Sequence, residues 1–123
     1  MGTLTSTEIG SIVYNMITGI PVGISGILTT IANQQVYFAE QLIGNTIGIT
    51  AIAEAYQPGL ISLTAANVME LMEAQGMGTK SVSIGELSIT KGMVDGTSKS
   101  LRDDGINKLK AIGERISYYQ AWG

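Results

Sequence analysis

Lys80-Ser-Val-Ser-Ile-Gly-Glu-Leu-Ser-Ile-Thr-Lys91 carries the period-two alternation of a β-strand, the one convincing β signal in the sequence. Its apolar residues alternate with serine or threonine, and the phase changes at Gly85-Glu86, where a tight turn or bulge is expected. Two short strands do not make a stable sheet alone, so we expect 80–91 to project as a hairpin and to pack against a neighbouring subunit. The residues expected to make this inter-subunit contact are Val82, Ile84, Gly85, Glu86, Leu87 and Ile89.

Helical patterns flank this stretch on both sides. Thr5-Ser-Thr-Glu8 has the form of a capping box, and a helix is predicted from there to Gly19. Gly44 is expected in the left-handed conformation that ends a second helix, and Pro58 at the first position of a later one. Beyond the first helix, the predicted helices cover about 25–43, 49–57, 58–76 and 98–119, with a loop over 92–97. We therefore predict a single, mainly α domain over 1–123: a small helical bundle of about four to five helices with one projecting β-hairpin-like segment.

Two features inside the predicted helices have packing consequences. Tyr37 and Phe38, near the end of the second helix, are expected in the core or in an interface. Gly105 and Gly113 each weaken the last helix by about 1 kcal/mol relative to alanine. Either another backbone packs closely against these two glycines, or they are tolerated imperfections.

The amino-acid composition excludes several classes of function for this protein. The 123 residues include no cysteine and no histidine. Disulfides, thiolate chemistry, the usual zinc sites and a histidine base are therefore excluded. The formal net charge of −3 provides no basic surface for nucleic acid, so a sequence-specific DNA-binding protein is not expected.

A stretch of 31 residues between Glu8 and Glu40 carries no charged side chain. A membrane-spanning helix needs about 20 predominantly apolar residues. This stretch instead contains serine, threonine, asparagine and glutamine, is interrupted at Pro21, and has no flanking basic residue. Burial against other protein is the better explanation, which favours oligomerisation.

The charges that are present divide unevenly along the chain. Residues 1–79 carry five glutamates and no basic residue, a net charge of −5, whereas residues 80–123 carry +2. This asymmetry suits a protomer whose two ends meet different neighbours, or each other in a ring. Chance clustering in a small protein is the alternative.

Two sequence patterns suggest a catalytic or metal site, but each lacks the other residues or the spacing that such a site requires. Ser88-Ile-Thr-Lys91 matches the Ser-x-x-Lys pattern of serine acyl-enzymes, but the further motifs of that class are missing. Asp95, Asp103 and Asp104 do not have calcium-loop spacing, and the last two are better explained as acids near a helix start. We expect no enzyme activity, no catalytic or metal site, and no cofactor.

The C-terminal segment 117–123 concentrates aromatic residues. Tyr118, Tyr119 and Trp122 place the only tryptophan and two of the five tyrosines within the last six residues. Side chains of this kind are common anchors of protein interfaces, which predicts a docking tail for a partner protein. The alternative is that they fold back on the protein's own core.

In three places the sequence resembles the head–tail connector (adaptor, or neck) proteins of tailed bacteriophages and related viruses. One is the aromatic-rich helix end Tyr37-Phe-Ala-Glu-Gln-Leu-Ile-Gly44. The second is Ser81-Val-Ser-Ile-Gly-Glu-Leu-Ser-Ile-Thr90, which is similar to a sequence motif found between the last two helices of several such proteins. The third is a final helix that ends in tyrosine with another aromatic residue close behind. The sequence departs from many relatives in its first helix, where Glu8 stands alone instead of an acidic cluster.

The resemblance implies a structural protein of the virion, located at the neck, where head and tail meet, and in the host cytoplasm during assembly. Such a protomer forms a homo-oligomeric ring, commonly of twelve, that docks on the portal protein and extends the DNA channel to the next neck or tail protein. DNA is then close by without being specifically bound, and no membrane is involved. By position, 84–91 is the reaching hairpin and Tyr118 to Trp122 the tail that docks on the portal.

Two other functions stay open from the sequence. One is a small membrane-active, holin-like protein built on residues 9–39, against which the polar residues and Pro21 argue. The other is a generic oligomerisation module in a non-viral assembly.

Overall fold

A computed structural model describes residues 2–17, 19–75, 81–84, 87–90 and 94–122, with only the backbone described for 81–84, 87–90, 94–97 and 114–122. Helices dominate these residues, which confirms the mainly α class predicted from the sequence. The elements in chain order are α1 (Ser6–Met16), α2 (Val22–Ser25), α3 (Leu28–Ile43), the 3₁₀ turn η1 (Glu54–Tyr56), α4 (Gln57–Ala74), β1 (Ser81–Ile84), β2 (Leu87–Thr90) and α5 (Val94–Trp122).

Local sequence signals account for several helix ends. The Thr5 hydroxyl accepts a hydrogen bond from the Glu8 amide at 3.1 Å, and the Glu8 carboxylate accepts one from the Thr5 amide at 3.0 Å. This is the predicted capping box, and α1 begins there. Gly44 ends α3 with φ of 67°, as predicted, because glycine has no Cβ to oppose the left-handed conformation. Pro58 lies in the first turn of α4, where its missing N–H costs nothing.

The predicted helix over 49–57 is wrong. Ile52 instead forms an isolated antiparallel bridge with Leu4, in which each amide donates to the other residue's carbonyl, at 2.7 and 3.0 Å. The Ile52 side chain is fully buried by this arrangement, so tertiary packing outweighs the local helical pattern. The Glu40 carboxylate also accepts the amides of Ile47 and Gly48, both at 2.8 Å, which fixes the loop before the bridge.

Two other helix boundaries differ from the prediction. The helix expected over 25–43 begins only at Leu28, as α3, because Gly26 and Ile27 form a turn; the residues before that turn make the separate short helix α2. The last helix begins at Val94 and ends at Trp122, so it takes up part of the loop expected over 92–97. Residues 92 and 93 lie outside the described residues.

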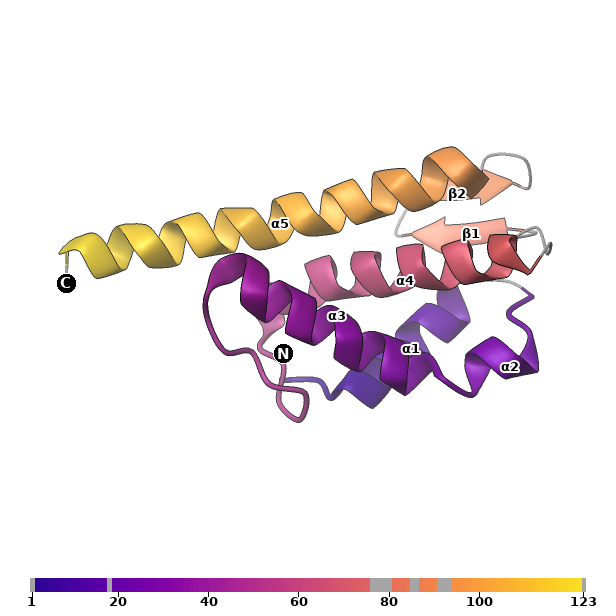
Figure 1. Cartoon of the computed structure of the whole chain (residues 1–123), viewed down its shortest axis with the longest axis horizontal. Helices are drawn as coiled ribbons and strands as arrows, with labels where there is room; N and C mark the ends of the chain where they lie inside the picture. Colours follow the sequence, from indigo (N-terminus) through magenta and orange to yellow (C-terminus); the bar gives the residue numbers. More distant parts are fainter. Residues whose placement is uncertain (1, 18, 76–80, 85–86, 91–93, 123) are drawn as a thin grey trace.

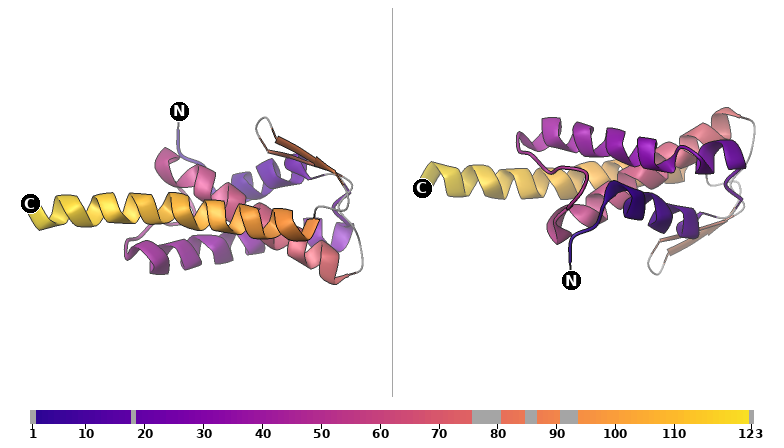
Figure 2. Two further views of the ribbon diagram at one scale, coloured as in Figure 1. Left: turned by 90° about the horizontal axis from the view of Figure 1, so that it is seen from above. Right: turned by 90° about the horizontal axis from the view of Figure 1, so that it is seen from below.

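Helix α4 forms the centre of the bundle. It packs against α5 on one side and against α1 and α3 on the other (Figure 1; Figure 2). Its burial extends around most of its circumference, which is wider than the single apolar face of an ordinary amphipathic helix. The buried residues of α4 are Gly59, Leu60, Ser62, Leu63, Thr64, Ala65, Ala66, Val68, Met69 and Met72. A helix enclosed in this way positions the other three long helices around it.

Glycines allow α4 and α5 to come close together. A Cβ placed on Gly105 would lie 2.8 Å from the Gly59 carbonyl oxygen and 2.8 Å from Leu63 Cγ. A Cβ on Gly59 would lie 2.8 Å from Leu109 Cγ. Further along α5, a Cβ on Gly113 would lie 3.2 Å from Ile43 Cβ, at the end of α3. Of the two explanations for Gly105, close packing of another backbone is therefore the correct one.

Strands β1 and β2 pair antiparallel, with Ser81 opposite Thr90 and Ile84 opposite Leu87. Backbone contacts link β1 to α1 and β2 to α5. Of the residues predicted to make an inter-subunit contact here, Gly85 and Glu86 lie outside the described residues, and Val82, Ile84, Leu87 and Ile89 are described in their backbone. Projection of this segment toward a neighbouring subunit stays a prediction.

Candidate protein–protein interface

The large exposed apolar side chains of the described residues gather in one part of the chain, on α1, α2, α3 and the turn between α2 and α3. They are Tyr14, Val22, Ile27, Tyr37 and Phe38, with exposed fractions of 41–87%. Exposed aromatic and aliphatic side chains of this kind are typical of protein interfaces. Tyr37 and Phe38 are therefore outside the core. Of the two locations expected for them, core or interface, only an interface is still possible.

The same part of the molecule contains no charge. It corresponds to the 31 residues between Glu8 and Glu40. Loss of charged residues together with a gain of aromatic ones distinguishes the centre of an interface from ordinary surface. We call the exposed residues of this stretch, from Ser11 on α1 to Phe38 on α3, the uncharged surface.

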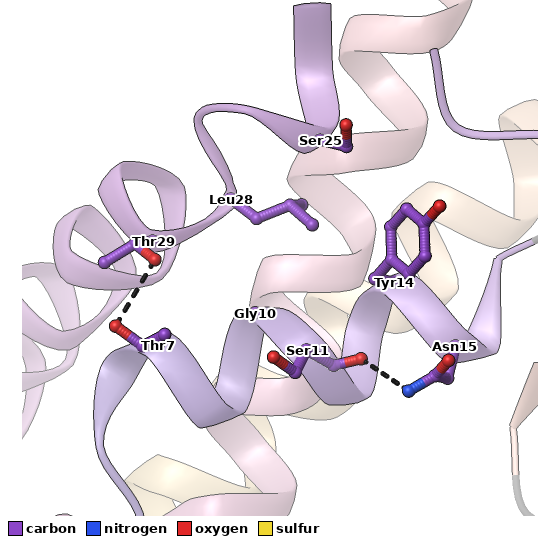
Figure 3. Close-up of a pocket in the computed structure, with 8 residues that line it drawn as sticks. All are labelled: Thr7, Gly10, Ser11, Tyr14, Asn15, Ser25, Leu28 and Thr29. Carbon is purple, nitrogen blue, oxygen red and sulfur yellow. Dashed lines mark hydrogen bonds between the residues drawn. The ribbon is translucent and has the colours of Figure 1, made fainter. Parts of the chain in front are cut away.

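A groove lies at the edge of the uncharged surface, between α1 and the start of α3 (Figure 3). Its lining residues are Thr7, Gly10, Ser11, Tyr14, Asn15, Ser25, Leu28 and Thr29. A Cβ on Gly10 would lie only 3.2 Å from Leu28 Cβ, so the two helices approach closely at the groove floor. We call this feature the α1–α3 groove.

The polar groups of the α1–α3 groove retain capacity for new hydrogen bonds. The Thr29 hydroxyl bonds to the Thr7 hydroxyl at 3.4 Å, and the Asn15 side-chain amide donates to the Ser11 carbonyl at 3.0 Å (Figure 3). Hydroxyl and amide groups both donate and accept, so each of these side chains can bond to a further partner. The groove is suited to polar, uncharged contacts around an apolar floor.

A second feature lies further along α3. Gln34, Tyr37, Phe38 and Gln41 are all exposed and form its outward side. Nine residues separate Phe38 from Thr29 in the α1–α3 groove, and at about 100° per residue this places them on opposite flanks of α3. We call these four residues the α3 ridge.

The charged side chains of the described residues lie elsewhere, and several of them pair. Arg102 of α5 pairs with Glu70 of α4, and Lys108 pairs with Asp104 at 2.9 Å, while the Ser62 hydroxyl donates to Asp104 at 3.1 Å. Exposed pairs of this kind contribute about 0–1 kcal/mol each. Within the described residues, no three histidine, cysteine, aspartate or glutamate side chains gather as a metal site would require.

The described site residues predicted from the sequence lie in β1 and β2, before α5, and in the C-terminal part of α5 (Figure 1). Tyr118, Tyr119 and Trp122 belong to its last turns, and β2 precedes its first turn. Beyond Gly113, which lies against Ile43, the helix runs past the other helices (Figure 2). The tail and the hairpin segment are therefore not brought together, and docking by either one stays a prediction.

Sequence reasoning missed the α1–α3 groove, although a signal for it exists. Thr7, Ser11 and Asn15 recur every fourth residue, so they share one face of α1. That face would have marked a polar stripe on an otherwise apolar helix. Its partner residues on α2 and α3 could not be found without the tertiary structure.

Comparison with protein-family models, curated proteins and solved structures gives no match to this chain. None of the helices in the described part of the chain has both the length and the apolar character required to cross a bilayer.

Proposed function

We propose that this protein is a structural component of a virion neck, a head–tail connector that forms a ring and docks on the portal. The observation that carries the proposal is the uncharged surface, which holds the large exposed apolar side chains of the described residues. Such a surface is costly for an isolated soluble protein and suits one that is covered by neighbours. Its function is then assembly and docking, without chemistry.

The placement of the two ends of α5 supports this proposal. One end follows the hairpin segment, which in this proposal reaches toward a neighbouring subunit or the next ring. The other end carries Tyr118, Tyr119 and Trp122 away from the bundle, where they dock on the portal (Figure 1). The ring, of twelve copies, extends the DNA channel to the next neck or tail protein. DNA passes close by without being specifically recognised.

The proposal predicts a defined oligomer in the presence of portal. We expect native mass spectrometry and negative-stain imaging of the purified chain, mixed with the portal protein of the same virus, to show a closed ring bound at one end of the portal. A chain that stays monomeric and ignores portal under all conditions would contradict the proposal. A ring that forms alone and never binds portal would instead support a generic oligomerisation module.

A second prediction concerns the C-terminal tail. Replacing Tyr119 and Trp122 together by alanine should weaken portal binding by about 100- to 1000-fold, because aromatic anchors contribute about 2 kcal/mol each at interface centres. Far-UV circular dichroism should show nearly unchanged helix content. Gln120→Ala is the matched control in the same helical turn and should bind as the unmodified chain does. Loss of folding on truncation after Ser117 would instead indicate that the tail packs on its own core.

A further inference from the structure

The α1–α3 groove and the α3 ridge have complementary surfaces. We propose that the groove of one copy of this chain receives the ridge of the next copy. The inference rests on the proposed function, because it names the two surfaces through which ring neighbours meet. Three observations support it: the charge on the two surfaces, the hydrogen-bonding groups that they offer, and their positions on α3.

Charge complementarity selects the occupant of the groove. A charged side chain placed in the α1–α3 groove would lose its hydration and find no opposite charge among the lining residues. The described surface outside the uncharged stretch exposes many charges. They include Glu8, Glu73, Lys99, Asp103, Lys108 and Lys110. The α3 ridge carries none, so it can enter the groove without burying an unpaired charge.

The α3 ridge and the α1–α3 groove also carry side chains of the same kinds, which are uncharged hydrogen-bonding groups and aromatic rings. Tyr37, with 56% of its surface exposed, offers a hydroxyl that donates and accepts, and Gln34 and Gln41 flank it with amides. The groove lining offers the hydroxyl and amide groups of Thr7, Ser11, Asn15, Ser25 and Thr29. Phe38 in the ridge and Tyr14 in the groove wall add aromatic surface, which is a strong contributor to interface energy.

The positions of the two features favour a ring over a two-fold dimer. Around α3 the ridge residues lie about 80–180° from Thr29, with Phe38 opposite it, so the groove and the ridge face different sides of the helix and one copy can engage a different neighbour through each. A contact between two different surfaces is heterologous, and it generates a closed ring when the rotation between copies closes. A helix rises about 1.5 Å per residue, so Thr29 and Tyr37 lie about 12 Å apart along α3. The ridge therefore cannot fill its own groove.

Charge insertion at exposed helical positions tests this contact. Ser11→Glu places an acid in the groove, and Tyr37→Lys places a base on the ridge. Each single variant should weaken self-association by about 10- to 100-fold, because it buries a charge without a partner. The double variant Ser11→Glu/Tyr37→Lys should regain most of this loss, since the acid of one copy then faces the base of the next. The measurement is sedimentation velocity over a concentration series, with portal present and absent.

Matched controls separate this contact from other effects. Asn107→Glu and Asn107→Lys introduce the same charges at an exposed position of α5, and both should assemble as the unmodified chain does. Glutamate and lysine are good helix formers, so circular dichroism should show folded variants. Gln34→Lys replaces Tyr37→Lys if the latter fails to fold.

The outcomes distinguish this inference from the proposed function. Rings that are unaffected by either single variant, or single-variant losses that the double variant does not restore, would overturn the groove–ridge contact and leave the ring proposal standing. If the single variants still form rings but no longer bind the portal, the uncharged surface contacts the portal and not a neighbouring copy. An unmodified chain that never self-associates would overturn both.

Discussion

Replacing Gly105 by alanine lowers the free energy of unfolding by about 1–3 kcal/mol, the opposite of the usual effect of this change inside a helix. Gly105 has no positive φ, so an alanine fits its backbone and would by itself stabilise α5 by about 1 kcal/mol. The added methyl group, however, would lie 2.8 Å from the Gly59 carbonyl oxygen and 2.8 Å from Leu63 Cγ. Because one of these atoms belongs to the backbone, α4 and α5 must move apart.

Urea unfolding followed by circular dichroism measures this effect. Gly23→Ala in α2 is the control, since a Cβ there meets nothing within 4 Å. We expect that variant to be neutral or slightly stabilised. If Gly105→Ala were stabilised to the same extent, α4 and α5 would not be in contact through their backbones as described. Gly105→Val, which adds two more methyl groups at the same place, should be still less stable.

The parts of the fold that could be predicted from the sequence depend on local chemistry. The capping box at Thr5 and Glu8, the left-handed Gly44 and the position of Pro58 each concern a few neighbouring residues. Their energies are set within one helical turn, whatever the rest of the chain does. This is why the starts of α1 and α4 and the end of α3 lie close to their predicted positions.

The errors occur where distant residues decide the structure. The segment 49–57 has a helical pattern, but Ile52 pairs with Leu4, 48 positions earlier, and is buried there. Leu60 and Met69 of α4 are both fully buried although, nine positions apart, they lie on opposite faces of the helix. A helix enclosed by three others buries several faces, and no single stripe in its sequence can indicate this.

The candidate interface was predictable in its location but not in its form. The missing charges between Glu8 and Glu40 indicated a surface covered by other protein. The α1–α3 groove, by contrast, depends on the close approach of Gly10 to Leu28, which only the packed helices show. The division of the surface into a groove and a ridge, and hence the proposed contact between copies, follows from that packing.

Leu109→Ala combined with Gly59→Ala should be less destabilised than the two single variants together. Leu109 is fully buried, and its truncation alone should cost about 2–5 kcal/mol through lost contacts and the cavity that remains. Gly59→Ala alone should cost about 1–3 kcal/mol, because the new methyl group would lie 2.8 Å from Leu109 Cγ and 3.2 Å from Leu109 Cδ2.

In the double variant the methyl group at position 59 enters space that the leucine has left. Most of the clash disappears, and part of the cavity is filled. The remaining contact, 3.2 Å to the Gly105 carbonyl oxygen, keeps the compensation incomplete. A double-mutant cycle in urea should therefore show a favourable coupling of about 1–2 kcal/mol.

A second cycle provides the comparison. Val13 is also fully buried, but it belongs to a different cluster of the core, formed with Ile17, Ile24 and Met69. Val13→Ala combined with Gly59→Ala should be additive within about 0.5 kcal/mol, because the two changes share no space. Equal coupling in the two cycles would mean that the interaction does not arise between positions 59 and 109. Coupling confined to the first cycle would locate the close approach of α4 and α5 at the atoms described, and with it the direction in which α5 leaves the bundle.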